Sequence, residues 1–192
     1  VAVVAKALPI WWMAAQTRGA HTSDKNTKYA WRVFIGLLFC SVGDLCLDLE
    51  HHSELFFLGG LASFLVGHVW YIAAFAVGHP TVVCPMHGIP FYVFALGMFK
   101  YLQDSLPEDL TIPVLVYSLV IATMGHRAVT RRTHVFASTG VSLAMWGSLS
   151  FILSDSILAI NKFAHPFKNA KVAVMVTYYL GQILIGQSAT PA

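Results

Sequence analysis

Long apolar stretches, separated by short polar connections, divide this 192-residue chain into seven segments. Within each segment the hydrophobic residues run continuously and do not alternate with polar ones, so the pattern predicts helices and not the strands of a barrel. A helix needs roughly 20 mainly apolar residues to cross the hydrocarbon core of a bilayer. The predicted segments cover residues 1–15, 30–49, 55–77, 81–102, 111–128, 135–160 and 170–188.

The connections between these segments are too short to hold a second domain. We therefore predict an all-α fold, a polytopic transmembrane helix bundle that forms one domain over residues 1–192. The segment at residues 1–15 is too short to span a membrane, and it begins with Val1 and not with a methionine. We expect the chain to start inside a helix, with further sequence upstream.

The composition agrees with a membrane protein: 57% of the residues are hydrophobic and 11% are charged, whereas soluble domains carry about 25% charged residues. Such a composition excludes a disordered chain. Three scattered cysteines exclude a disulfide scaffold. The net charge of +3 is small, and the basic residues stand in short clusters between apolar segments. This placement is typical of a topology signal, so we expect membrane lipids and no nucleic acid as partners.

Two aspartates lie inside predicted spans, where an ionisable side chain costs roughly 3 kcal/mol on insertion scales. Asp44 belongs to residues 30–49 and Asp155 to residues 135–160. Both segments are even-numbered and run in the same direction, which puts both aspartates near the same membrane face. Like charges at low dielectric cannot both ionise cheaply, so we expect the pair to share one proton as an acid beside a carboxylate. Asp48, one turn beyond Asp44, is a secondary candidate.

In the third segment His68 and Tyr71 share a helix face with Phe64. The same segment also carries a row of small residues. A lone histidine in such a helix is more often a hydrogen-bonded structural residue than a ligand. The small residues form a ridge that lets a neighbouring helix pack closely and would also permit a homodimer. The ridge consists of Gly59, Ser63 and Gly67.

Tyr178 and Gln182 are spaced i, i+4 in the last segment, so they are expected to point into the bundle together. They would hold water or a lipid headgroup, or form hydrogen bonds between helices. Lys6 lies in an apolar stretch and would either reach the interface or point inward to meet a phosphate.

Motifs of several other enzyme classes are missing from the sequence. It contains no G-x-S-x-G elbow, no P-loop and no H-E-x-x-H helix. Ser154 directly precedes Asp155, so the two side chains diverge by about 100° on a helix and cannot act as nucleophile and base. His51 and His52 stand beside acidic residues but have no matching second cluster, so we expect no metal and no cofactor.

Five short motifs, in this order, resemble those of the YhhN-like lysoplasmalogenase family of membrane proteins. The likeness covers essentially the whole chain. The motifs are the K-x-L-P pattern of Lys6 and Pro9, the G-D-x-x-L pattern of Gly43 to Leu47, the F-x-x-x-H-x-x-Y pattern of Phe64, His68 and Tyr71, the S-D helix and following N-K-F in Phe151 to Phe163, and the T-Y-Y-x-x-Q element of Thr177 to Gln182.

The resemblance implies eight transmembrane helices in the full-length family, one of them absent here. It also implies hydrolysis of the vinyl-ether bond of a lysoplasmalogen, a 1-alkenyl-glycerophosphoethanolamine or -choline. The products are a fatty aldehyde and glycerophosphoethanolamine or glycerophosphocholine. The expected location is the endoplasmic reticulum or another endomembrane. The family's two key aspartates correspond to Asp44 and Asp155.

On this interpretation the two aspartates act as general acid and base, and no metal is needed. Further candidates hold the ether oxygen or the water, or contact the phosphate. The first group is His68, Tyr178 and Gln182, and the second is Lys6 and Lys162. Tyr71 is a further substrate-binding candidate. Two alternatives of another class stay open: a proton- or cation-coupled transporter that uses the same two acids, and a non-catalytic lipid-binding protein.

Overall fold

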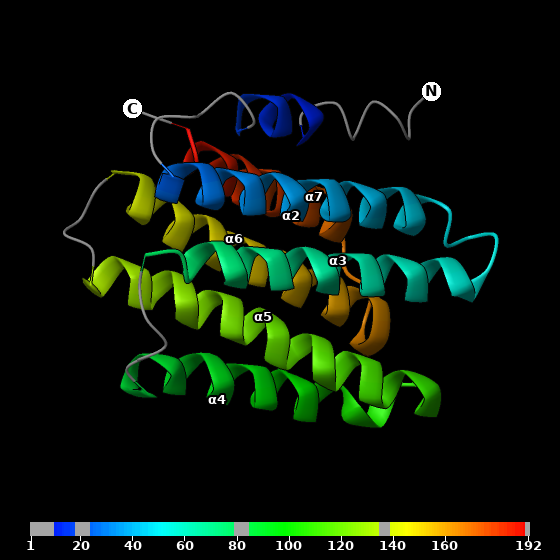
Figure 1. Cartoon of the computed structure of the whole chain (residues 1–192). Helices are drawn as coiled ribbons and strands as arrows, with labels where there is room; N and C mark the ends of the chain where they lie inside the picture. The colour runs from blue at the N-terminus through cyan, green and yellow to red at the C-terminus, as the bar shows by residue number, and fades with distance from the viewer. Residues whose placement is uncertain (1–9, 18–23, 79–84, 135–138, 191–192) are drawn as a thin grey trace.

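The computed structural model describes residues 10–17, 24–78, 85–134 and 139–190 (Figure 1). Over these ranges the elements are helices, and none is a strand. A first helical segment at residues 10–17 is followed by six helices: α2 (Asp24–Asp48), α3 (Glu54–Phe75), α4 (Pro85–Leu102), α5 (Glu108–His134), α6 (Thr139–Ala159) and α7 (Ala170–Gln187). A 3₁₀ turn, Gln103–Ser105, follows α4, and a π-helical turn, Ile160–Ala164, follows α6. The predicted all-α bundle is confirmed.

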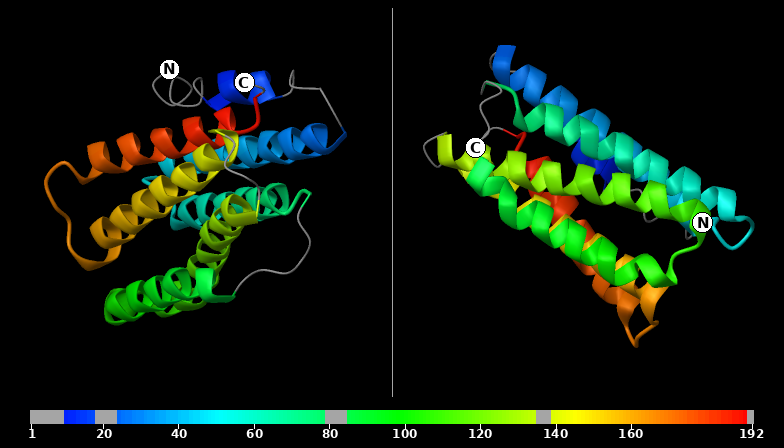
Figure 2. Two further views of the ribbon diagram at one scale, coloured as in Figure 1. Left: turned by 90° about the vertical axis from the view of Figure 1, so that its left-hand side faces the viewer. Right: turned by 90° about the horizontal axis from the view of Figure 1, so that it is seen from below.

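Consecutive helices run antiparallel, so α2, α4 and α6 point one way and α3, α5 and α7 point the other (Figure 1). The closest pairs are α2 with α3 and α6 with α7, while α5 contacts α3, α4 and α6. Figure 2 shows α4 on the outside of the bundle, against α5. The helices that carry Asp44 and Asp155 therefore run parallel, as the segment count predicted.

Four described helical stretches are long and apolar enough to cross a membrane. They are Thr27–Asp48, Glu54–Phe75, Glu108–Arg131 and Thr139–Ala164. The other two predicted spans, α4 and α7, are shorter helices of 18 residues each. Large apolar side chains such as Leu55, Met86 and Val93 are exposed on the surface of the bundle, as a surface in contact with lipid requires.

Small residues bring α3 close to α2, largely as the ridge predicted. The Ser63 hydroxyl donates to the Phe39 carbonyl at 2.7 Å, and a Cβ atom added to Gly67 would lie 2.8 Å from Cys40 Sγ. The third small residue at this contact is Gly60, whereas Gly59 is exposed. Two residues of the predicted ridge, Ser63 and Gly67, are thus covered by α2 within the chain.

The α6–α7 pair approaches even more closely, backbone against backbone. A Cβ atom added to Gly147 would lie 2.9 Å from the Gly181 carbonyl oxygen, and one added to Gly181 would lie 3.0 Å from the Gly147 carbonyl oxygen. Tight contact through small residues is a common way for membrane helices to associate. It sets the register of α6 against α7, and therefore the relative positions of Asp155 and Tyr178.

The Gly147→Ala substitution should destabilise the bundle, because the new methyl group meets backbone atoms that cannot move independently. Overpacking of this kind costs about 1–3 kcal/mol. Gly97→Ala is the matched control, since Gly97 is exposed on α4 and nothing lies within 4 Å of an added Cβ atom. Thermal unfolding in detergent should show a lower midpoint for Gly147→Ala and an unchanged or higher midpoint for Gly97→Ala. Equal midpoints would contradict the close approach.

Candidate active site

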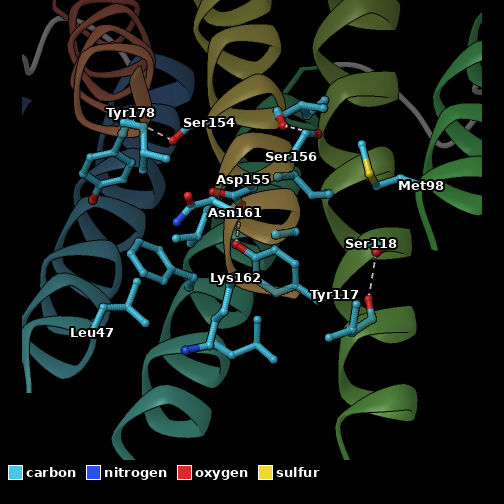
Figure 3. A pocket seen from close by; sticks show the side chains of 18 of the residues that line it. Leu47, Met98, Tyr117, Ser118, Ser154, Asp155, Ser156, Asn161, Lys162 and Tyr178 are labelled. Atoms are coloured by element: carbon cyan, nitrogen blue, oxygen red, sulfur yellow. Dashed lines mark hydrogen bonds between the residues drawn. The ribbon is translucent and has the colours of Figure 1, made fainter. Parts of the chain in front are cut away.

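A cavity of about 350 Å³ lies inside the bundle, and both aspartates line it. Figure 3 shows Asp155 among the residues of its wall. Its walls come from all six helices α2 to α7 and from the π-helical turn after α6. Asp44 and Asp155 are 111 positions apart in the chain but reach this cavity because α2 and α6 run parallel within one bundle. The structure thus places Asp44 and Asp155, the two predicted catalytic residues, on the wall of one cavity.

Asp155 is held by a tyrosine from a different helix. The Tyr117 hydroxyl on α5 donates to Asp155 Oδ2 at 2.5 Å (Figure 3). The preceding residue, Ser154, turns to α7 and donates to the Val174 carbonyl at 3.1 Å. This arrangement agrees with the sequence argument that Ser154 and Asp155 diverge on the helix.

Asp44 lies at the end of a chain of three hydrogen bonds. The Tyr71 hydroxyl on α3 donates to Gln182 Oε1 at 2.6 Å, Gln182 Nε2 donates to the Tyr178 hydroxyl oxygen at 3.1 Å, and the Tyr178 hydroxyl donates to Asp44 Oδ2 at 2.7 Å. The expectation that Tyr178 and Gln182 point into the bundle together is confirmed. The chain joins α3, α7 and α2 through polar contacts inside the bundle.

His68 is fully buried among aromatic rings and does not line the cavity. Its ring centroid lies 4.7 Å from that of Phe151 and 5.4 Å from that of Tyr117, both in edge-to-face contacts. Among the residues that the structure describes, neither ring nitrogen has a hydrogen-bond partner, which differs from the expected hydrogen-bonded structural histidine. Its contacts help to hold the Tyr117 ring behind Asp155.

A polar rim borders the cavity at the end of the bundle where α2 and α6 finish. Lys162 Nζ lies 2.9 Å from Glu50 Oε2 and 4.2 Å from the centroid of the Phe57 ring. Asp48 and Lys171 also line the cavity there. The other predicted phosphate contact, Lys6, lies outside the described residues.

An apolar arm continues the cavity toward α4 and α5. Its walls there are aromatic and aliphatic side chains, including Phe91, Phe94, Met98, Val114 and Ile121. The space is therefore amphipathic: charged groups stand at the rim, two aspartates lie along the wall, and hydrocarbon lines the remainder. Among the described residues, no group of three or more His, Cys, Asp or Glu side chains gathers to hold a metal ion.

The predicted site residues fall into two sets. Asp44, Asp155, Tyr178 and Lys162 line the cavity, whereas His68, Tyr71 and Gln182 stand behind its wall. Sequence reasoning missed Tyr117. An intramembrane tyrosine needs a hydrogen-bond partner for its hydroxyl, but 38 residues separate it from Asp155, so no helical spacing connects the two.

Comparisons with known proteins give a consistent result. The family model described as YhhN family matches residues 1–189. The chain is 35% identical over 190 residues to lysoplasmalogenase TMEM86B of Sus scrofa, covering 99% of this chain and 76% of the relative. It is 32% identical over 205 residues to lysoplasmalogenase TMEM86A of Homo sapiens, covering 98% of this chain and 78% of the relative. No solved structure matches the chain.

The ion pair at the rim should contribute little to the stability of the fold. Both side chains are partly exposed, Lys162 at 30% and Glu50 at 43%, and exposed pairs are worth about 1 kcal/mol or less. A double-mutant cycle with Lys162→Met and Glu50→Gln, followed by chemical unfolding, should give a coupling free energy in that range that decreases with added salt. A much larger coupling would show that the rim supports the fold itself.

Proposed function

Because the chain belongs to the YhhN family, we propose that it is a lysoplasmalogenase, a membrane hydrolase that cleaves the vinyl-ether bond of 1-alkenyl lysophospholipids. The products are a fatty aldehyde and glycerophosphoethanolamine or glycerophosphocholine. The family match extends over residues 1–189, and the relatives that bear this name align with nearly the whole chain. The structural observation that carries the proposal is the placement of Asp44 and Asp155 on one amphipathic cavity.

The hydrolysis of a vinyl ether needs an acid and a base, and two carboxyl groups can supply them. Hydrolysis begins with protonation of the β-carbon, which leaves an oxocarbenium ion, and water then attacks the cation. One group must deliver a proton, and another must stabilise the cation and accept a proton from water. Glycosidases meet the same demand with two carboxyl groups that flank an oxocarbenium-like transition state. Asp44 and Asp155 are acids in the cavity wall that lie within spanning helices, whereas Asp48, which also lines the cavity, is the last residue of its helix.

The shape of the cavity matches a single-chain amphiphile. The alkenyl chain would occupy the apolar arm beside Phe94 and Met98, and the headgroup would lie at the rim, where Lys162 and Lys171 face a phosphate. The vinyl-ether bond, which joins chain and headgroup, then falls beside the two aspartates. A lipid of this kind would enter from the bilayer between helices, so an aqueous channel is not required.

We place the protein in the endoplasmic reticulum or another endomembrane, in keeping with the resemblance between its motifs and those of the family.

The chelation of metal ions should not affect turnover, because the proposed steps use carboxyl groups alone.

Asp44→Asn and Asp155→Asn should each lower turnover by about 100-fold or more, since an asparagine supplies neither an acid nor a base. Asp104→Asn is the matched control, because Asp104 is an exposed acid in the 3₁₀ turn and does not line the cavity. The measurement is aldehyde release by purified protein from a 1-alkenyl lysophospholipid. Full activity in either cavity variant would remove that aspartate from the mechanism. A wild-type protein that releases no aldehyde would favour a transporter or a lipid-binding protein.

Lys162→Met should raise KM several-fold and leave kcat nearly unchanged, because a headgroup contact contributes equally to binding the ground state and the transition state. Lys162→Arg retains the positive charge and should restore most of the affinity. Lys168→Met, which removes an exposed lysine outside the cavity wall, should leave KM unchanged. A loss in kcat alone would instead connect Lys162 with the chemical step.

A further inference from the structure

We propose that Tyr71 and Gln182 are positioning residues that fix the direction of the hydrogen bond at Asp44, and that they thereby assign the two catalytic roles. Asp44 is the carboxylate that activates water, and Asp155 is the acid that protonates the substrate. This assignment rests on the proposed lysoplasmalogenase function and adds to it. Both candidate groups are aspartates and both line the same cavity, so neither residue type nor location distinguishes the acid from the base.

The direction of these hydrogen bonds follows from which groups of Tyr71, Gln182 and Tyr178 donate and which accept. A tyrosine hydroxyl has one proton to donate. The Tyr178 oxygen already accepts a hydrogen bond from Gln182 Nε2 at 3.1 Å, so the hydroxyl of Tyr178 donates its own hydrogen to Asp44 Oδ2 at 2.7 Å. Tyr71 donates to Gln182 Oε1 at 2.6 Å and so orients the amide with its nitrogen toward Tyr178. All three hydrogen bonds therefore run in one direction, from Tyr71 toward Asp44.

The burial of Tyr71 and Gln182 preserves the direction of these hydrogen bonds. The Tyr71 and Gln182 side chains are 0% exposed, and Cys40 lies against both of them. No bulk water reaches them to replace one of the bonds, and aligned hydrogen bonds in a low-dielectric interior strengthen one another. An ionised carboxylate only accepts hydrogen bonds. The network is therefore matched to the charged form of Asp44 and mismatched to a carboxyl group that must donate.

Asp155 has a different environment. Its partner is the Tyr117 hydroxyl, and within the described part of the chain no group donates to the oxygen of that hydroxyl. The surroundings of the Tyr117 ring include His68, which contacts it edge to face. A protonated Asp155 can therefore donate to Tyr117, and an ionised Asp155 can accept from it. This bond tolerates both protonation states, as the acid in a catalytic cycle must.

With these roles the reaction balances. Asp155 gives its proton to the β-carbon, and the electron pair of the carbon–carbon double bond forms the new carbon–hydrogen bond. As the water oxygen bonds to the oxocarbenium carbon, Asp44 takes one proton from that water, and a hemiacetal results. Asp155, now ionised, then removes the hydroxyl proton as the carbonyl forms. The bond to the glycerol oxygen breaks, and Asp44 returns its proton to that oxygen.

The cycle ends with Asp155 protonated and Asp44 ionised, as it began. One water molecule and one vinyl ether become one aldehyde and one alcohol, without any other reactant. Tyr178 must accommodate a neutral Asp44 only while the hemiacetal exists. The hydrogen-bond network behind Tyr178 thus favours an ionised Asp44 in the resting state and favours the return of Asp44 to that state.

Infrared spectroscopy of the resting protein tests the assignment without turnover. At neutral pH the wild-type protein should show the carbonyl stretch of a protonated carboxyl group, shifted in D₂O. The band should disappear in Asp155→Asn and remain in Asp44→Asn. A band that disappears in Asp44→Asn and remains in Asp155→Asn, or no band in the wild-type protein, would overturn the assignment.

The role of the positioning residues is tested by kinetics. Gln182→Met keeps the size of the side chain but removes its donor and acceptor, so kcat should fall by about tenfold to a hundredfold. KM should change little, because Gln182 does not line the cavity. Gln187→Met is the control: Gln187 is exposed on the same helix, and its replacement should leave both constants unchanged. A folded Gln182→Met protein with the kcat of wild type would refute the positioning role.

The two readouts separate failure of this inference from failure of the proposed function. Normal aldehyde release together with a reversed infrared assignment would refute the roles and leave the activity intact. No aldehyde release together with the expected infrared result would refute the lysoplasmalogenase function. The polarity of the hydrogen bonds at the two aspartates would then stand as a property of the fold.

Discussion

A carboxyl group inside a membrane-spanning helix must find a hydrogen-bond donor on another helix, and this requirement organises the interior of the bundle. Asp44 on α2 accepts a hydrogen bond from the Tyr178 hydroxyl of α7, and Asp155 on α6 accepts one from the Tyr117 hydroxyl of α5. Each bond ties two helices together at the depth where lipid would otherwise meet an ionisable group. The same bonds hold the carboxyl oxygens at the wall of the cavity, so one constraint serves both the fold and the chemistry proposed for the two aspartates.

Close helix contacts set these bonds in place. Gly147 and Gly181 let the backbones of α6 and α7 meet, and Ser63 and Gly67 do the same for α3 against α2. Because an interior packed at this density does not deform continuously, the register of each pair is well defined. The tyrosine hydroxyls are short-range donors and depend on that register to reach the aspartates.

The polar interior has two layers. Groups that can touch a substrate line the cavity, and a second set behind the wall, including Tyr71 and Gln182, governs how the first set is hydrogen-bonded. His68 belongs to the second set through ring contacts alone. A substrate-binding role for these three residues was the natural expectation from their positions on helix faces. Their burial behind the wall favours a role in orienting the groups that touch the lipid.

The sequence by itself determined the all-α bundle, the antiparallel order of the helices and the presence of two aspartates within apolar segments, because continuous apolar runs and isolated acids within them are local signals. The i, i+4 spacing also sufficed to pair Tyr178 with Gln182. Only the tertiary structure decided that Tyr117 binds Asp155, that Gly60 and not Gly59 completes the α2–α3 contact, and that the hydrogen bonds behind Asp44 all point toward it. These features join residues on different helices, and their geometry depends on the rotation and depth of each helix, which periodicity does not specify.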